Sequence, residues 1–461
     1  MLQPYDEYKQ SESPFERIIP AHWQEKRLSW MFQFTSIQNK VDEELLSVFL
    51  DKGVVSYAST SQKQVHKPSD DLSKYQLVEI GDFVLNNQQA WRGSVGVSGY
   101  RGIVSPAYYV LKPRIEINST FLNYMVRSND VVDQFMLASK GVGSIQKQIS
   151  VPYLKRTVLA IPPRPEQDQI VRFLNWKTSE IAHFIKEKRK EIETFVELKN
   201  SIILHAVVKG IKRNTTMKEC TIEWIDTVPS HWDEKMLFQC AAEQSISNKT
   251  VHHQNLLSLS YGKIVNKDIN TTEGLLPASF DTYQIIHDGN VILRLTDLQN
   301  DHKSLRVGLA TQKGIITSAY TCLKARNNIL PEYLYLLLHS YDVSKVFYGM
   351  GGGVRQSIGY TDIRRMTILL PPIEEQKAIV AYCCEEQTKI EQMISGIKDE
   401  ISLVQELRTK TIADVVTGKV DVCNVEIPQY EPEVDDTTDE EYPDEESGEE
   451  NDDTTDEEVD E

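Results

Sequence analysis

The sequence predicts an α+β protein: two globular α/β domains separated by two long helices that form an antiparallel coiled coil, with an internal pseudo-two-fold repeat. Three observations predict this fold class. The motif IPAHW at 19–23 recurs as VPSHW at 228–232, and IPPRPEQ at 161–167 recurs as LPPIEEQ at 370–376. Each proline-rich motif opens a long segment with apolar residues in steps of three and four, the spacing of a coiled-coil seam. Segments this long are expected to pair with each other rather than pack on one small domain.

Each copy of the repeat begins with a mixed globular domain, expected at 20–163 and at 228–372. Short strand-like runs, such as LVEIGDFVLN in the first copy and IIHDGNVILR in the second, alternate with turn residues. Gly81 and Gly289 occupy matching turns in these runs. The two domains are therefore predicted to share one fold.

The long helices are expected at 164–212 and 373–422. Pro165 suits a first helical position, and the acidic residues that follow it favour the positive end of the helix dipole. The seam positions are Ile170, Leu174, Ile181, Ile185, Ile192, Phe195, Ile202 and Ala206 in the first helix, and Ile390, Ile394, Ile397, Ile401 and Val404 in the second. Antiparallel pairing would place the domains at opposite ends, related by an approximate two-fold axis. The alternative is that each helix packs only on its own domain.

Three segments remain: an N-terminal lead-in at 1–19, a connector at 213–227 and an acidic tail at 423–461. The stretch 431–461 holds 19 Asp or Glu and no Lys or Arg. A segment of this composition cannot bury enough apolar surface to fold, so we expect the tail to be disordered.

Composition narrows the class of protein. The net charge is −18, but the acidic tail accounts for all of it, so the rest of the chain is near neutral and local basic faces can still meet phosphates. The N-terminus lacks a signal peptide pattern and no apolar run approaches about 18 residues, so we expect a cytoplasmic protein that does not cross a membrane. The six cysteines form no CxxC pair, which predicts reduced thiols and no metal site.

The two copies differ most in one loop, at 86–101 in the first copy and 294–313 in the second. The flanking sequences GIVSPAY and GIITSAY match again at once. The loop is rich in Arg, Lys, Asn, Gln and Asp, the residue types that read base edges, and a second polar, glycine-containing stretch precedes the proline-rich boundary. The candidate DNA contacts are Asn86, Gln88, Gln89, Trp91, Arg92, Lys140, Ser144, Gln146 and Lys147 in the first copy and Arg294, Asp297, Gln299, Asn300, Lys303, Arg355 and Gln356 in the second. For any single one of them, a solvated loop side chain is an equal alternative.

Several motifs together resemble one protein family. HAVVKGI at 205–211, MKECTIEWIDTVPSHWDEKMLF at 217–238 and VVTGKVDV at 415–422 are similar to the specificity subunit of Type I restriction-modification systems, and the resemblance covers residues 9–422. It implies that each globular domain is a target recognition domain that reads one half of a bipartite, asymmetric site in double-stranded DNA. It further implies that the helices dock two modification (methyltransferase) subunits and that restriction (translocase/nuclease) subunits join the complex.

The same resemblance implies a non-catalytic chain that binds no cofactor itself. S-adenosylmethionine would be held by the partner methyltransferase, and ATP and Mg by the restriction subunit. The residues agree with this, because the sequence contains no HExxH, GxxxxGK[ST] or nucleotide-binding GxGxxG motif.

Three interpretations stay open at this point. The alternative function is a non-catalytic protein-interaction scaffold without DNA specificity, which would bind its partners with little dependence on salt. The acidic tail has either a solubilising role or competes with DNA for basic loops. Trp23 and Trp232, which hold the same place in both copies, are interpreted as core anchors rather than as side chains that stack on bases.

Overall fold

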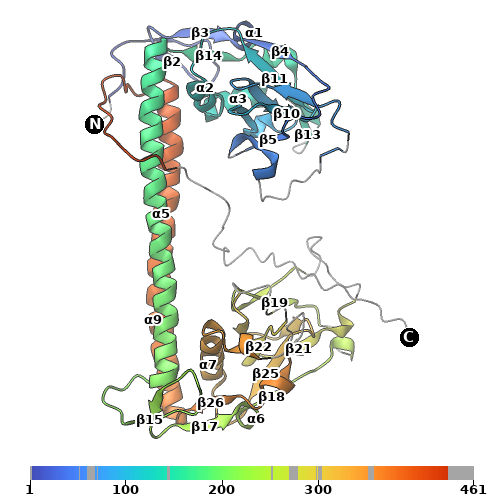
Figure 1. The fold of residues 1–461 in the computed structure, drawn as a ribbon, viewed down its shortest axis with the longest axis vertical. Helices are drawn as coiled ribbons and strands as arrows, with labels where there is room; N and C mark the ends of the chain where they lie inside the picture. The colour runs from blue at the N-terminus through green and yellow to red at the C-terminus, as the bar shows by residue number, and fades with distance from the viewer. Residues whose placement is uncertain are drawn as a thin grey trace. The chain divides into compact units, whose positions relative to one another are not determined.

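The computed structural model divides into two compact units (Figure 1). Unit 1 holds Met1–Lys188 with Lys398–Thr438, and unit 2 holds Arg189–Ile397 with Asp439–Glu461. Each unit contains one mixed α/β domain and part of each of two long helices. The residues that the structure describes are 3–50, 52–59, 68–69, 71–142, 146–250, 253–268, 279–296, 298, 304–350 and 358–433.

The domain of unit 1 is built on a four-stranded antiparallel sheet. In spatial order its strands are β4 (Phe32–Thr35), β11 (Tyr108–Pro113), β8 (Phe83–Asn86) and β9 (Val95–Val97). Two further antiparallel pairs are β5 (Leu46–Phe49) with β6 (Gly53–Ser56), and β7 (Gln76–Val78) with β10 (Gly102–Val104). The helices of this domain include α2 (Ser119–Val126) and α3 (Asn129–Leu137). Phe83 of the sheet and Phe135 of α3 stack in the core, so the apolar face of α3 is buried against the sheet.

The domain of unit 2 has the same strand order. Its four-stranded sheet consists of β18 (Ala241–Glu243), β25 (Thr321–Ala325), β22 (Asn290–Leu293) and β23 (Val307–Leu309). The two accompanying pairs are β19 (Leu257–Ser260) with β20 (Lys263–Asn266), and β21 (Gln284–Ile286) with β24 (Gly314–Ile316). A single longer helix, α7 (Pro331–Val343), follows β25, where α2 and α3 follow β11 in unit 1. The predicted fold class, with its internal repeat, is confirmed.

The start and the end of each domain are joined by a two-stranded sheet. β3 (Gln24–Arg27) pairs with β14 (Val158–Ile161), and β17 (Asp233–Met236) pairs with β26 (Thr367–Leu370). Before each of these sheets comes a small hairpin, β1 (Tyr8–Gln10) with β2 (Ile18–Pro20) and β15 (Met217–Glu219) with β16 (Thr227–Pro229). The remaining short elements are α1 (Leu28–Met31), α4 (Val151–Leu154), α6 (Leu237–Cys240), α8 (Tyr360–Ile363), and the hairpin of β12 (Ser139–Val142) and β13 (Gln146–Ile149).

The long helices α5 (Arg164–Lys209) and α9 (Ile373–Val416) run antiparallel within each unit. In unit 1 the first turns of α5 share a core with Val415 and Val416 at the end of α9, and farther along Lys188 Nζ lies 3.0 Å from Glu400 Oε2. In unit 2 the last turns of α5 share a core with Ile379 near the start of α9. Partner numbers on α9 therefore fall as numbers on α5 rise, which is the direction that the sequence predicts.

The predicted seam forms the contact between the helices. Its side chains are buried at Ile170, Leu174, Ile185, Ile192, Ala206, Ile390 and Ile397 and half-buried at Ile181, Phe195, Ile202, Ile394, Ile401 and Val404. Charged residues occupy the outer faces, as expected for a coiled coil in water. No helix among the described residues has the length and apolar character needed to cross a membrane.

The two repeated motifs meet at a joint in each unit. In unit 1, His22 Nε2 lies 2.7 Å from Glu166 Oε2, and Trp23 Nε1 donates to Glu166 Oε1 at 2.8 Å. In unit 2, His231 Nε2 lies 2.7 Å from Glu375 Oε2. Both carboxylates are in the first turn of a long helix and are almost fully buried, so the histidines and the helix dipole offset the cost of burying a charge.

The joint of unit 1 has more donors than the joint of unit 2. Tyr5 Oη also donates to Glu166 Oε1, at 2.7 Å, and burial, reinforced by this carboxylate, raises the pKa of Tyr5 well above its usual value. In unit 2, Trp232 Nε1 is buried without a hydrogen-bond partner among the described residues. Trp23 and Trp232 are both buried, which confirms them as core anchors.

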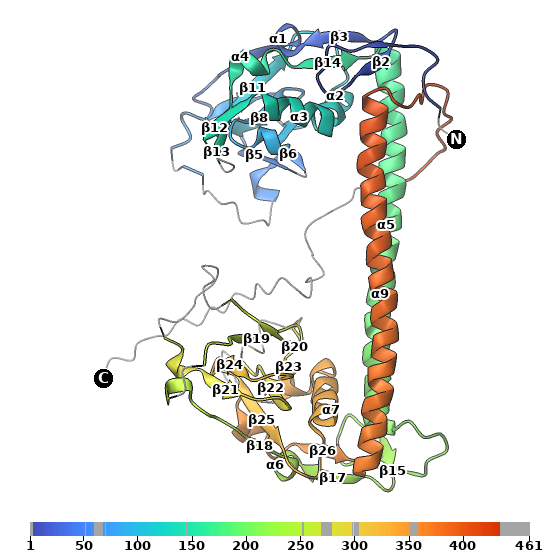
Figure 2. The ribbon, with the colours of Figure 1, turned by 180° about the vertical axis from the view of Figure 1, so that it is seen from behind.

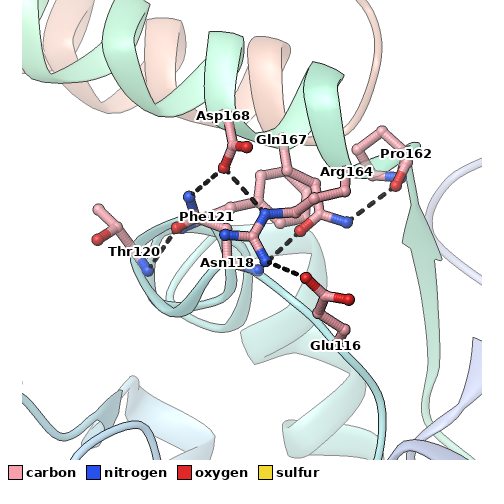
Figure 3. Close-up of polar contacts among 8 residues, drawn as sticks. All are labelled: Glu116, Asn118, Thr120, Phe121, Pro162, Arg164, Gln167 and Asp168. Carbon is pink, nitrogen blue, oxygen red and sulfur yellow. Dashed lines mark hydrogen bonds and ion pairs between the residues drawn. The ribbon is translucent and has the colours of Figure 1, made fainter.

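The glutamine next to each joint glutamate ties the domain to the helix start (Figure 3). Gln167 Nε2 donates to the carbonyl of Pro162 at 2.9 Å, and its Oε1 accepts from the backbone N of Asn118 at 2.9 Å. Asn118 is also the N-cap of α2, since its Oδ1 accepts from the N–H groups of Thr120 and Phe121. In unit 2, Gln376 makes the equivalent bonds to the carbonyl of Pro371 and the N–H of Leu330.

The end of the opposite helix completes each joint. Gly210, after α5, has φ +75°, and Gly418, after α9, has φ +76°, the left-handed conformation that ends a helix at little cost only for glycine. A Cβ at Gly418 would overlap Pro20, and one at Gly210 would lie 3.3 Å from the Trp232 ring. In unit 2 the chain continues from Gly210 into β15. In unit 1 the N-terminal segment takes the corresponding place beside the helix end, where Asp421 N donates to the Gln3 carbonyl at 2.8 Å.

Residues 423–433 lie along α5 in unit 1, which differs from the disorder expected from residue 423 onward. Gln169 Nε2 donates to the carbonyl of Val425 at 2.9 Å, and Ser179 Oγ donates to that of Glu431 at 3.0 Å. Lys186 Nζ lies 2.9 Å from Glu433 Oε2. Val425 and Ile427 also pack against the core of unit 1. The prediction of disorder rested on the acidic composition of the tail and did not consider these two apolar residues. The rest of the acidic tail lies outside the described residues.

A buried histidine predicts a pH dependence of the stability of unit 2. Burial, and to a smaller extent the nearby Lys199 ammonium, lowers the pKa of His339 to about 4, below its value in the unfolded chain. The unfolded chain therefore binds more protons as pH falls below about 6.5, so the contribution of His339 is fully present above that pH and lost on acidification. We expect H339L to lose about 2 kcal/mol less unfolding free energy than the parent between pH 7 and pH 5 in denaturant titrations. Equal losses in both proteins would contradict this.

The unequal joints predict unequal costs for one substitution. E166A leaves Trp23 Nε1 and Tyr5 Oη as buried donors without their acceptor, at about 1–3 kcal/mol each. E375A removes an acceptor that, among the described residues, serves only the exposed His231. We therefore expect E166A to lower the free energy of unfolding more than E375A in matched thermal and denaturant unfolding. The same loss in both variants would show that the additional donors of unit 1 add nothing.

Candidate nucleic-acid interface

The loop after β8 has a defined shape in the first copy. Asn86 Oδ1 accepts from the backbone N of Gln88 at 3.0 Å, which closes a tight turn. A short 3-10 helix, η2 (Ala90–Arg92), follows, and Trp91 Nε1 donates back to the carbonyl of Gln88 at 2.8 Å. Gly93, with φ +104°, then turns the chain into β9. The Asn86 side chain thus shapes the loop, and Gln88 and Arg92 are exposed on it.

The structure brings the second polar stretch against this loop. The β12–β13 hairpin is joined to it by Ile149 N, which donates to the Asn87 backbone and side-chain oxygens, each at 3.0 Å. Figure 2 shows the hairpin in the same domain as β8. Lys147 Nζ lies 4.6 Å from the centroid of the Trp91 ring. The sequence predicted the two stretches separately, and the fold makes them one surface of cations and aromatic rings.

The predicted residues of the first copy differ in exposure. Gln88, Arg92 and Lys140 are exposed, and Asn86, Gln89, Trp91 and Lys147 are half-buried. Gln146 is described only as part of β13. Ser144 lies outside the described residues. Arg92, Lys140 and Lys147 thus place three exposed or half-exposed cations on this surface, and cations are the groups that contact phosphates.

In the second copy, only Arg294 among the predicted residues is described. It is half-buried, directly after β22, and its backbone N donates to the carbonyl of Arg306. The predicted Asp297, Gln299, Asn300, Lys303, Arg355 and Gln356 lie outside the described residues. The structure therefore describes only the base of this loop, and all seven contacts of the second copy stay predictions.

Arg306 anchors the base of the second loop, and the sequence analysis missed it. Its side chain is fully buried. One guanidinium nitrogen donates to the carbonyl of Thr296 at 2.7 Å, and Nε donates to Tyr348 Oη at 3.0 Å. The equivalent residue in the first copy is Ser94, which donates to the carbonyl of Val48. The sequence did offer a signal for Arg306: it directly precedes an apolar strand, where the second copy begins to match the first again. A buried guanidinium must be hydrogen-bonded, so an Arg at this place predicts an anchor for the neighbouring loop.

Two cationic residues outside the predicted stretches extend the first surface. Lys140 Nζ lies 4.5 Å from the Tyr153 ring centroid, and the Arg156 guanidinium lies 5.5 Å from the same ring. Lys155 is next to Arg156 and is also exposed. The sequence signal was a pair of basic residues at the same place in both copies.

Within the described part of the chain, no group of three or more His, Cys, Asp or Glu is arranged to hold a metal ion.

Comparisons with known proteins agree with this architecture. The family model of the Type I restriction modification DNA specificity domain matches residues 20–194. The chain is 23% identical over 374 residues to the putative type I restriction enzyme MjaX specificity subunit of Methanocaldococcus jannaschii, covering 77% of this chain and 81% of that protein. Both similarities extend beyond a single motif.

A solved structure shares the fold. A chain from work on complex assembly and conformational transition of the type I R-M system has a TM-score of 0.54 at 14% identity, covering 88% of this chain and 100% of that one. The HsdS subunit of Thermoanaerobacter tengcongensis has a TM-score of 0.43 at 16% identity, covering 88% and 97%. With the repeated domains, the paired helices and the motif joints, the sequence matches make this chain similar to the specificity subunits of Type I restriction-modification systems.

Proposed function

We propose that this chain is the sequence-specific DNA-binding subunit of a Type I restriction-modification complex, in which each recognition domain reads one half of a bipartite, asymmetric site in double-stranded DNA. One observation carries the proposal. The same sheet, in the same strand order, carries two unlike loops at the same place, between β8 and β9 and between β22 and β23. One scaffold with two different inserts suits two different DNA words.

The chemistry of the first loop supports base reading next to phosphate contacts. Arg and Lys pair with guanine edges, and Gln pairs with adenine edges. Gln88 and Arg92 are exposed there, beside the half-buried Gln89 and the Lys147 ammonium on the Trp91 ring. Polar side chains on a rigid turn are suited to direct readout, since the turn limits the entropy lost on binding.

We further propose that the two long helices dock two modification subunits and that restriction subunits join this core. Apolar side chains outside the seam support this at equivalent positions of the two helices. Phe184 on α5 is 36% exposed and its counterpart on α9, Met393, is 52% exposed; Leu198 is 46% exposed and its counterpart, Leu407, is 55% exposed. Exposed apolar positions that occur twice suit two copies of one partner.

In this proposal the chain supplies DNA recognition and no catalytic group. Adenine methylation would use S-adenosylmethionine held by the modification subunit, and restriction would use ATP and Mg in the restriction subunit. The complex would act in the cytoplasm, where its DNA is.

Methylation mapping tests the function. Single-molecule sequencing of DNA from cells that express this chain with its methyltransferase should reveal a split motif that is absent from cells lacking only this chain. A methyltransferase that is folded and present but yields no motif dependent on this chain would contradict the proposal.

Exchange of one loop tests the assignment of loops to words. Replacing 86–101, a segment that also contains β9, with the corresponding segment of another specificity subunit should change one half of the methylated motif and leave the other half and the spacing unchanged, because each segment belongs to a separate domain. Replacing 294–313 is the matched experiment and should change the other half. A change in both halves, or in neither, from either exchange would refute the assignment.

A further inference from the structure

Both domains carry a pair of basic residues on a short turn just before their last strand. Lys155 and Arg156 lie between α4 and β14, and Arg364 and Arg365 lie between α8 and β26. All four side chains are exposed. The backbone is nearly the same in the two turns, with φ −59° and ψ −20° at Lys155 and φ −58° and ψ −26° at Arg364.

Each turn is held in place by the short helix that follows β3 or β17. In unit 1, the N–H of Ser29 donates to the carbonyl of Lys155 at 3.3 Å, and the N–H of Leu28 donates to that of Thr157 at 2.8 Å. In unit 2, the N–H of Phe238 donates to the carbonyl of Arg364 at 3.0 Å. The basic pairs therefore stand on fixed backbone, so little entropy is lost when they bind a ligand.

The positive charges of both pairs are left available. Within the described part of the chain, none of the four forms an ion pair with a carboxylate. Instead, Lys155 Nζ lies 5.5 Å from the Phe34 ring centroid, and the guanidinium of Arg364 lies 5.8 Å from that of Phe238. An aromatic ring orients a cation without neutralising it.

The sequences around the two pairs differ, while the basic character is the same. The first pair stands in SVPYLKRT and the second in GYTDIRRM. The basic pair is present in both domains, whereas the loops differ between them. A site common to both domains is suited to a part of the ligand that is the same at every DNA sequence. In duplex DNA that part is the phosphate backbone.

The first pair is also continuous with the proposed reading surface. Arg156 and Lys140 both lie over the Tyr153 ring. Lys140 belongs to the β12–β13 hairpin, which also places Lys147 over the Trp91 ring. We propose that Lys155 with Arg156, and Arg364 with Arg365, are equivalent phosphate-binding sites that hold each recognition domain on DNA irrespective of sequence. This inference rests on the proposed function and extends it from reading to attachment.

The test uses the full chain in complex with its modification subunits. Affinity is measured by fluorescence anisotropy for a duplex with the mapped site and for a scrambled duplex of equal length, from about 50 to about 200 mM salt. The double variants K155Q with R156Q, and R364Q with R365Q, should each weaken binding about tenfold per lost phosphate contact near 0.1 M salt. The loss should be equal on both duplexes, the slope of log K against log salt should fall by about two, and the methylated motif should stay the same.

Two control variants separate the site from general charge effects. R364K with R365K keeps both charges and should keep the salt slope. K40Q with K74Q removes two exposed lysines from the same domain as the first pair and should leave the slope near that of the parent. Melting temperatures of all variants show whether each remains folded, and co-elution with the modification subunit shows whether the complex is intact.

Each outcome decides between the inference and the function on which it rests. If the parent complex bound both duplexes equally and its affinity did not depend on salt, the proposed function itself would be refuted. Normal parent binding with unchanged affinity in both double variants would overturn only the phosphate assignment, as would a loss confined to the specific duplex or an equal loss in the K40Q and K74Q control. Loss of the modification subunit from the double variants would show that the pairs bind a protein partner instead.

Discussion

A buried glutamate in the first turn of each long helix is the interaction on which the rest of the structure depends. Glu166 and Glu375 each accept from a histidine of the motif that opens the domain, 2.7 Å away. A buried carboxylate is tolerated only with such partners, so this contact fixes where the domain begins relative to where the helix begins. The neighbouring glutamine then ties the middle of the domain to the same turn.

The joints explain how one chain can carry two domains with unlike loops. The sheets, the β3–β14 and β17–β26 pairs and the helix starts are repeated almost element for element, while the loops after β8 and β22 are free to differ. Ser94 and Arg306 show how this freedom is managed. They occupy equivalent positions, and each donates to a backbone carbonyl: Ser94 to that of Val48 in β5, and Arg306 to that of Thr296 in its own loop. Different loops can thus leave the same sheet without disturbing it.

The negative and positive charges of the chain lie in different regions. The −18 of the whole chain reflects its acidic end, while exposed cations gather on the recognition domains beside aromatic rings. The described start of the acidic tail lies on α5, where Glu433 meets Lys186, so part of this charge is already paired. The local field at a domain surface, rather than the net charge, determines what it attracts.

The sequence by itself determined the repeat, the fold class, the long helices and their antiparallel seam, because periodic apolar residues and repeated motifs are local signals. It also marked the loops in which the copies differ. Only the tertiary structure decided that His22 meets Glu166, that Lys147 reaches the Trp91 ring, and that Arg306 and the start of the acidic tail are bonded where they are. These contacts join residues far apart in the chain, and their energy depends on burial and geometry that no local pattern contains.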